Sequence, residues 1–354
     1  MYLIPDPAWK FGCGRYIQKP GAFECLQEEV ARLGKKALVI SGRRAWQAVL
    51  DCYDEPLAGI SCRHVIHTQP CSEDAAREYV KVLKQENADV IVGIGGGKIM
   101  DLAKLMGEFS GCPVINVPTI CATCAAYTPL SVLYTPEGRA LGSWFFENEI
   151  ACLIADTRIM ALQPARYAFS GIADSMAKMI EIDHNIQYTS RGADMVFARY
   201  NAEYLYRRLS EIAPLMPEEL AKGVPSLLVE ELVYLTIAAT GMVSGCARGQ
   251  GQSALAHGLY EASRTLYTRE AQGYLHGEIV GVGLRLQLAY DNADGADLDR
   301  ILSALALPMH LRDIGIPENE AAYGLIAEDL KNRRLLDHEG DSTQRVIAAL
   351  KRIE

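Results

Sequence analysis

A run of glycines at positions 93–97 is the segment of this chain whose composition says most about chemistry. Residues 90–92 form a short apolar run of the kind found in buried strands, and residues 101–104 continue as a helix. A strand, a turn without side chains and a helix start together present free backbone N–H groups at the positive end of a helix dipole, which favours phosphate or pyrophosphate binding. The turn is not a Walker A loop, because Ile99 follows Lys98 where Ser or Thr is needed, and it is not a G-x-G-x-x-G motif, because Lys98 replaces the third glycine. An ordinary strand-to-helix turn is the alternative, but such a turn needs fewer glycines.

Three side chains further along the chain could share a metal ion. They are Asp174, His257 and His276, and each histidine is followed by glycine among small or apolar neighbours. One carboxylate and two imidazoles would bind a divalent metal and leave a coordination position open, as a catalytic site requires. A histidine in such surroundings is also often a hydrogen-bonded core residue. Because residues 257 and 276 are not one helical turn apart, spacing alone leaves both interpretations open.

The elements that must position these groups change in type along the chain. Strands are predicted at 37–41, 63–67, 88–92, 114–117 and 153–156, with helices at 43–50 and 73–87 between them. This alternation predicts a parallel sheet with helices on both faces. After about residue 160, helices are predicted at 171–188, 193–209, 227–245, 252–263, 276–291, 297–306 and 343–353. The expected organisation is a Rossmann-like α/β domain, residues 1–160, that binds a dinucleotide, and an all-α domain, residues 161–354, that binds metal and substrate.

Composition excludes several classes of partner. The chain has 354 residues, 49% of them hydrophobic and 22% charged, with a formal net charge of −9, so nucleic-acid binding is not expected. The first residues lack the basic and apolar regions of a secretion signal. We expect no apolar stretch of about 18 residues in the chain, and therefore no membrane span. Ten cysteines without a signal peptide indicate free thiols in a reducing, cytoplasmic compartment. Cys121 and Cys124 form a single C-x-x-C, which leaves a redox pair as an alternative but lacks the second pair of a zinc ribbon.

Six motifs in a fixed order resemble the iron-containing (group III) alcohol dehydrogenase superfamily, and within it the glycerol dehydrogenase branch. They are Gly-Gly-Gly-Lys-x-x-Asp-x-x-Lys at 95–104, Val-Pro-Thr at 117–119, Leu-Ser-Val-Leu-Tyr at 130–134, Gly-Ile-Ala-Asp at 171–174, Ala-His-Gly at 256–258 and His-Gly-Glu at 276–278. The resemblance extends from about residue 10 to about residue 310. It implies the dehydroquinate synthase-like architecture of that superfamily.

The resemblance also implies roles for individual residues. It assigns the catalytic metal to Asp174, His257 and His276, with zinc expected first and iron or nickel as alternatives. It assigns the dinucleotide to Gly97, Lys98, Thr119, Thr128, Leu130 and Tyr134. The turn and helix start that carry this motif add Gly95, Gly96 and Asp101 to the cofactor candidates.

Two positions depart from the glycerol dehydrogenase pattern and indicate a different substrate. Cys124 stands where those enzymes carry an aspartate that hydrogen-bonds polyol hydroxyls, and a thiol is a poor partner for a diol. The surrounding run is more similar to hydroxycarboxylate dehydrogenase A-like enzymes, which also have cysteine there. Lys178 follows Asp174 by one helical turn and could hold a substrate carboxylate. The alternative is that Lys178 pairs with a nearby acid or with solvent; Arg248 is a weaker candidate for the same role.

The end of the second strand bears on the cofactor. NAD enzymes usually carry an acidic residue there for the ribose hydroxyls, whereas an arginine accommodates the 2′-phosphate of NADP. This chain has Gly42, Arg43 and Arg44 and no acid. We therefore expect NADP to be accepted and preferred over NAD, although two arginines at a solvated helix start are the plainer interpretation.

These inferences combine into one hypothesis about function. We expect a metal-dependent, NAD(P)-linked alcohol or hydroxycarboxylate dehydrogenase that transfers hydride between nicotinamide and a small 2-hydroxy or 2-oxo acid. A glycerol or other polyol dehydrogenase is the first alternative, and the dehydroquinate synthase and glycerol-1-phosphate dehydrogenase branches are further ones. An inactive nucleotide- and metal-binding sensor is the alternative from another class. The resemblance also implies a homo-oligomer, at least a dimer.

Overall fold

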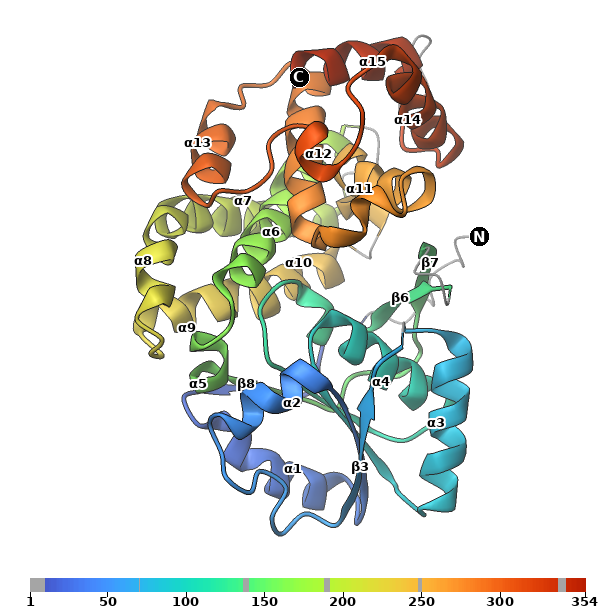
Figure 1. Cartoon of the computed structure of the whole chain (residues 1–354), viewed down its shortest axis with the longest axis vertical. Helices are drawn as coiled ribbons and strands as arrows, with labels where there is room; N and C mark the ends of the chain where they lie inside the picture. The colour runs from blue at the N-terminus through green and yellow to red at the C-terminus, as the bar shows by residue number, and fades with distance from the viewer. Residues whose placement is uncertain (1–9, 70, 136–139, 188–191, 248–249, 337–341) are drawn as a thin grey trace. The chain divides into compact units, whose positions relative to one another are not determined.

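The computed structural model describes residues 10–69, 71–135, 140–187, 192–247, 250–336 and 342–354 (Figure 1). The chain forms two compact units. The first unit comprises Met1–Ala168 and Glu218–Gly245, and the second comprises Phe169–Pro217 and Cys246–Glu354.

A six-stranded parallel sheet lies at the centre of the first unit. Its strands are β1 (Tyr16–Lys19), β2 (Ala37–Gly42), β3 (Cys62–His67), β4 (Val90–Gly95), β5 (Val114–Pro118) and β8 (Cys152–Asp156). Their order in space is β1-β8-β5-β4-β2-β3, and each neighbouring pair is parallel. The strand order reverses at β2, which has β3 on one side and β4 on the other. The carboxyl ends of strands beside such a reversal form the usual ligand site of an open α/β sheet.

Helices cover both faces of this sheet. They are α1 (Leu26–Leu33), α2 (Arg43–Leu50), α3 (Glu73–Gln85), α4 (Gly97–Ser110) and α5 (Thr157–Ala161). Successive side chains of a strand point to opposite faces. Val39 and Val92 therefore join the core under α1 and α2, whereas Leu38 and Ile91 join the core under α3 and α4. Strands buried on both faces explain the continuous apolar runs in the sequence.

A separate antiparallel ribbon, β6 (Leu130–Tyr134) and β7 (Ala140–Phe145), accompanies the sheet. It packs against α4, and Ser131 Oγ donates a hydrogen bond of 2.8 Å to the carbonyl of Asp101 in that helix. The ribbon is therefore held in place by the helix that starts at the glycine turn.

One apolar helical run belongs to the first unit although it lies late in the sequence. It consists of α9 (Leu227–Val233), a π-helical turn η4 (Tyr234–Ala239) and α10 (Thr240–Cys246). The run Leu227–Cys246 is long and apolar enough to span a membrane, with a mean hydropathy of 1.5, so the expectation that no such stretch exists was wrong. Its most apolar window is 61% buried. The carbonyl of Glu230 also accepts a hydrogen bond of 2.8 Å from Gln18 in β1, and Tyr234 meets Tyr16 edge to face, which fits a core helix of this unit.

The second unit is built from helices. They are α6 (Ala165–Asn185), α7 (Ala193–Ile212), α11 (Leu255–Leu266), α12 (His276–Asp291), α13 (Ala296–Ala304), α14 (Glu320–Asn332) and α15 (Ser342–Arg352). The first turn of α6 still belongs to the first unit, and α8 (Met216–Ala221) begins in the second unit and ends in the first. Helix α12 packs against α11 and α15. Most residues of α12 are buried, in agreement with a sequence that is apolar on every side.

The predicted fold class is confirmed: a parallel sheet with helices in the N-terminal region is followed by a mostly helical remainder. The sequence analysis missed β1, the β6–β7 ribbon, the helices α1, α5 and α8, and most of α14. The predicted domain boundary at residue 160 differs from the division seen here, because the first unit continues to Ala168 and also includes Glu218–Gly245.

Candidate functional site

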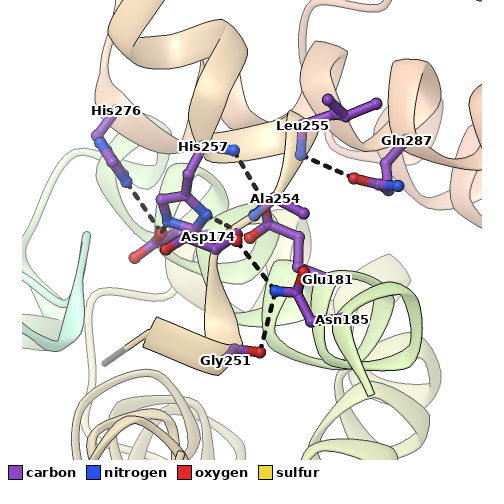
Figure 2. A network of polar contacts seen from close by, with 10 residues as sticks. Asp174, Glu181, Asn185, Gly251, Ala254, Leu255, His257, His276 and Gln287 are labelled. Carbon is purple, nitrogen blue, oxygen red and sulfur yellow. Dashed lines mark hydrogen bonds and ion pairs between the residues drawn. The ribbon is translucent and has the colours of Figure 1, made fainter. Parts of the chain in front are cut away.

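Asp174, His257 and His276 lie together in the second unit. Asp174 is in the middle of α6, His257 is in the first turn of α11, and His276 is the first residue of α12. Nε2 of His276 is 3.1 Å from Oδ1 of Asp174, and Nε2 of His257 is 3.4 Å from the same oxygen. Figure 2 shows both rings directed toward this carboxylate. The three candidate ligand atoms all lie within 4.8 Å of one another.

This geometry fits a divalent metal. Two ligand atoms bound to one Zn²⁺ at about 2.1 Å in tetrahedral geometry lie about 3.4 Å apart, close to the separations found here. Burial by itself would raise the pKa of Asp174, but His276, His257 and Lys178 together lower that pKa well below its usual range. The carboxylate is therefore ionised, as a metal ligand must be. The side chain of His276 is 27% exposed, so the centre stays open on that side.

Two glycines explain why the helices that carry these ligands can approach so closely. A Cβ on Gly277 would lie 1.8 Å from the carbonyl oxygen of Ser170 in α6, and a Cβ on Gly283 would lie 2.5 Å from the carbonyl oxygen of Ala256 in α11. Both distances are too short for any other residue unless the backbone moves. The glycine after His276 is therefore part of the construction of the site, because it lets the start of α12 rest on α6.

Glu181 is a component of this centre that the sequence analysis did not identify. Its carboxylate is fully buried, and Oε2 lies 2.5 Å from Nδ1 of His257. Burial would raise the pKa of Glu181, but the charge of His257 and the hydrogen bonds from its ring and backbone N–H lower it. Burial would likewise lower the pKa of His257, yet Glu181 and Asp174 raise it to about 9 in the metal-free protein. The available signal was spacing, because Glu181 follows Asp174 by two turns of one helix.

Lys178 lies between these two acids on the same face of α6. The residue is only 5% exposed. In the part of the chain that the structure describes, its ammonium group has no hydrogen-bond acceptor and no carboxylate within ion-pair distance. Its charge nevertheless lowers the pKa of both Asp174 and His257, so it is near the metal candidates. A buried cation beside this centre is suited to bind an anionic ligand.

The glycine turn in the first unit lies at the carboxyl edge of the sheet. Gly95 ends β4, Gly96 precedes α4, and Gly97 and Lys98 open that helix. No side chain caps the helix at Gly96, and its first turn holds no acidic residue. A small pocket opens at this point, lined by Gly96, Gly97, Met100, Pro118, Ile120, Ala122, Thr123 and Ala126. The free helix N-terminus and this pocket together suit a pyrophosphate group.

The chain segment facing this turn is fixed by one lysine. Lys104, in α4, donates hydrogen bonds to the carbonyls of Ala125, at 2.7 Å, and Thr128, at 3.1 Å, and also to that of Leu130. Its ammonium group is 3.0 Å from Oδ1 of Asp101 as well. These contacts hold the segment that carries two of the predicted cofactor residues, Thr128 and Leu130.

Asp101 and Thr119 are both buried at this edge. Oδ2 of Asp101 accepts a hydrogen bond of 3.3 Å from the amide of Val132, and burial raises the pKa of Asp101 against the lowering effect of Lys104. The carboxylate of Asp101 therefore contacts groups of the protein itself. It would contribute to cofactor binding indirectly, by holding the β6–β7 ribbon in place. Thr119 N–H donates to the carbonyl of Gly95 at 3.0 Å, which joins the loop after β5 to the glycine turn.

The remaining cofactor and substrate candidates are placed as follows. Gly42 ends β2, and Arg43 and Arg44 are exposed at the start of α2, whose first turn has no acidic residue. Tyr134 ends β6, but its side chain lies outside the described part of the structure, as does Arg248. Cys124 is buried in the first unit, whereas Lys178 belongs to the second.

Cys121 and Cys124 do not resemble a redox pair. Neither cysteine forms a disulfide, and burial raises the pKa of Cys121 although Gln163 and Thr236 lower it in part. The amide of Cys121 donates to Oε1 of Gln163 at 3.0 Å. A raised thiol pKa disfavours the reactive thiolate.

The chain is similar to known dehydrogenases over most of its length. Residues 13–155 match the family described as iron-containing alcohol dehydrogenase. The chain is 30% identical over 312 residues to the glycerol dehydrogenase of Thermotoga maritima, a match that covers 86% of this chain and 84% of that protein. It is 28% identical over 324 residues to hydroxycarboxylate dehydrogenase A of Escherichia coli, covering 88% of this chain and 86% of that one. A crystal structure of a probable glycerol dehydrogenase from Sinorhizobium meliloti matches with a TM-score of 0.85 and 26% identity over 98% of each chain. This protein is therefore an oxidoreductase that belongs to the iron-containing alcohol dehydrogenase family.

Proposed function

We propose that this oxidoreductase is metal-dependent and NAD(P)-linked, and that it interconverts a small 2-oxo acid and the corresponding 2-hydroxy acid. Asp174, His257 and His276 would hold the metal, and the convergence of their ligand atoms within 4.8 Å supports this. A divalent metal bound there supplies Lewis acidity, which stabilises negative charge on a substrate oxygen. Zinc is the metal that we expect first, with iron and nickel as alternatives.

Lys178 is the observation that carries the substrate class. Burying an ammonium group without a partner is costly, and a buried charge is normally paired. Lys178 is 5% exposed and has no partner among the described residues, so a ligand carboxylate would satisfy it. Cys124 supports the same class, because a thiol does not repel an anion as a carboxylate would.

The dinucleotide would bind at the carboxyl edge of the sheet. The N–H groups of Gly97 and Lys98 would contact the pyrophosphate, and Thr119, Thr128, Leu130 and Tyr134 would surround the rest of the cofactor. Arg43 at the start of α2, with no acid beside it, favours NADP over NAD. A nicotinamide dinucleotide bound there would supply the hydride that reduces the substrate carbonyl carbon, and a proton from water would complete the hydroxyl.

A polyol dehydrogenase is the second candidate. Relatives such as the Thermotoga maritima protein are named glycerol dehydrogenases, which favours this alternative. Cys124 argues against this alternative, because glycerol dehydrogenases carry at that position an aspartate that hydrogen-bonds the polyol hydroxyls. We also propose that the enzyme is a cytoplasmic homo-oligomer.

A substrate panel tests these proposals. The metal-loaded enzyme is assayed by nicotinamide absorbance with short 2-oxo acids and NADPH or NADH, and with glycerol and NADP or NAD. We expect turnover of at least one 2-oxo acid, with NADPH preferred, and little turnover of glycerol. His257→Ala should abolish both metal binding and turnover. Efficient oxidation of glycerol alone would establish the polyol alternative, and a fully active His257→Ala protein would contradict the proposed centre.

A further inference from the structure

Glu181 holds two parts of His257 at once. Its Oε2 lies 2.5 Å from the ring nitrogen Nδ1, while Oε1 accepts a hydrogen bond of 2.9 Å from the backbone N–H of the same residue. Oε1 also accepts a hydrogen bond of 2.6 Å from the backbone N–H of Ala254. Figure 2 shows this carboxylate between the start of α11 and the histidine ring.

A carboxylate can only accept hydrogen bonds, so the ring atom that faces Glu181 must be the donor. When His257 is neutral, its single ring proton therefore lies on Nδ1. Nε2 then keeps its lone pair, and this is the nitrogen that faces Oδ1 of Asp174 at 3.4 Å. Histidines that bind metals commonly depend on such an outer partner for their tautomer and ring orientation.

We propose that Glu181 is the positioning residue of the metal centre, which selects the Nδ1–H tautomer of His257 and directs Nε2 toward the ion. This inference rests on the proposed metal site. The carboxylate acts through His257 and does not itself face the ion: its two oxygens are occupied by the ring and by two backbone N–H groups. Because ring and backbone of His257 are held by one side chain, the ring has a single orientation relative to Asp174.

A purely structural role is the alternative, because Ala254, the residue that precedes α11, provides no capping side chain. Free N–H groups in the first turn of a helix need acceptors, and Glu181 supplies one. The chain contains a case that supplies the same cap without contacting His257. Oε1 of Gln287, in α12, accepts a hydrogen bond of 2.8 Å from Leu255 N–H and touches none of the three ligands, although the amide of Gln287 also donates a hydrogen bond of 2.8 Å to Oδ2 of Asp291.

The variant Glu181→Gln separates the two roles. The two backbone donors will keep the amide oxygen on their side, so the cap of α11 survives. The amide NH₂ then faces Nδ1, which must become an acceptor, and the ring proton moves to Nε2, where it blocks metal binding. We expect the dissociation constant for Zn²⁺, measured by competition with a chromophoric chelator, to rise about 10- to 100-fold. The visible spectrum of the Co²⁺-loaded protein should change as well.

Gln287→Met is the control. It removes a cap from the same helix start but leaves the histidine untouched, so the free energy of unfolding should fall while Zn²⁺ affinity and the Co²⁺ spectrum stay unchanged. If Glu181→Gln binds Zn²⁺ as tightly as the wild type with an unchanged Co²⁺ spectrum, the positioning role is refuted, although the metal site stands. If the wild type itself binds no stoichiometric Zn²⁺, the proposed function fails instead.

A measurement on the wild-type protein tests the proposal even if Glu181→Gln does not fold. In Zn²⁺-loaded protein labelled with ¹⁵N-histidine, the signals of His257 are assigned by their absence from the folded His257→Gln variant. Nδ1 should carry a proton that exchanges slowly with water. An unprotonated Nδ1 on His257 would overturn the proposal without any change at Glu181.

Discussion

Two lysines are buried to nearly the same extent, but only one of them has partners. Lys104 in the first unit is 3% exposed, and Lys178 in the second is 5% exposed. The ammonium group of Lys104 contacts three backbone carbonyls and the carboxylate of Asp101. The ammonium group of Lys178 contacts no acceptor within the residues that the structure describes.

This difference separates a charge that stabilises the fold from one that we propose binds a ligand. Lys104 is satisfied by the chain itself, and its removal would leave buried acceptors without donors. Lys178 forms no hydrogen bond or ion pair in the described part of the chain, and only the nearby charge of Asp174 offsets the cost of its burial. Burial alone therefore does not distinguish the two roles; the partners do.

Replacing Lys104 should have the largest effect. Lys104→Met leaves the buried Asp101 carboxylate and three carbonyls without their donor, and breaking a buried pair typically costs about 3–5 kcal/mol. Urea unfolding should show this loss. Adding Asp101→Leu to Lys104→Met should recover part of it, because an apolar pair leaves no isolated charge. If Lys104→Met left the free energy of unfolding unchanged, the structural role assigned to Lys104 would be contradicted.

The surroundings of Lys178 should make the stability of the protein depend on pH. The pKa of His257 is raised from 6.5 to about 9 in the metal-free protein, so its contribution to stability is complete below pH 6.5 and is lost as pH rises through 9. The loss is up to about 3 kcal/mol by linkage. Folding lowers the pKa of Asp174 and of Glu181. Their contribution to stability is therefore complete above the ordinary values of 3.8 and 4.5 and is lost only as pH falls below them.

Unfolding of the metal-free protein by urea across this alkaline range measures the effect. His257→Gln should remove most of the dependence. Stability that stays constant or increases between pH 6.5 and 9 would contradict the assignment of the ion pair between His257 and Glu181.

Replacing Lys178 should change catalysis more than folding. If Lys178 binds the substrate carboxylate as proposed, Lys178→Met removes a charge-assisted hydrogen bond worth about 1.5–3 kcal/mol, so kcat/KM for 2-oxo acids should fall about 10- to 100-fold. The free energy of unfolding of the ligand-free protein should stay the same or rise. A loss of stability as large as that of Lys104→Met, with kcat/KM unchanged, would show that both lysines serve the fold.

Much of the fold could be predicted because its strands are apolar on both faces and its helices are periodic. The strand that ends at Gly95 and the helix that starts at Gly97 follow directly from composition. The edge strand Tyr16–Lys19 was missed because it has four residues, none of them buried. The ribbon of β6 and β7 was missed because it is stabilised by packing against α4, a tertiary contact that the local sequence pattern does not reveal.

The candidate site was predictable in its ligand types but not in its support. Asp174, His257 and His276 were singled out by residue type and motif, and the structure brings them together. Glu181 was missed because a glutamate on a helix is usually solvated, and only the packing of α11 onto α6 buries it. That Lys178 lacks a partner could not be predicted either, since pairing depends on which side chains of other helices reach it.

The return of Glu218–Gly245 to the first unit has a consequence for synthesis on the ribosome. The sheet emerges early, but the helix whose Glu230 carbonyl accepts from Gln18 of β1 is translated only after the first part of the second unit. At about 5–20 residues per second, the nascent α/β half waits several seconds for this segment. A truncation after residue 168 would therefore expose apolar surface that the complete chain covers, which makes the isolated half a candidate for chaperone binding.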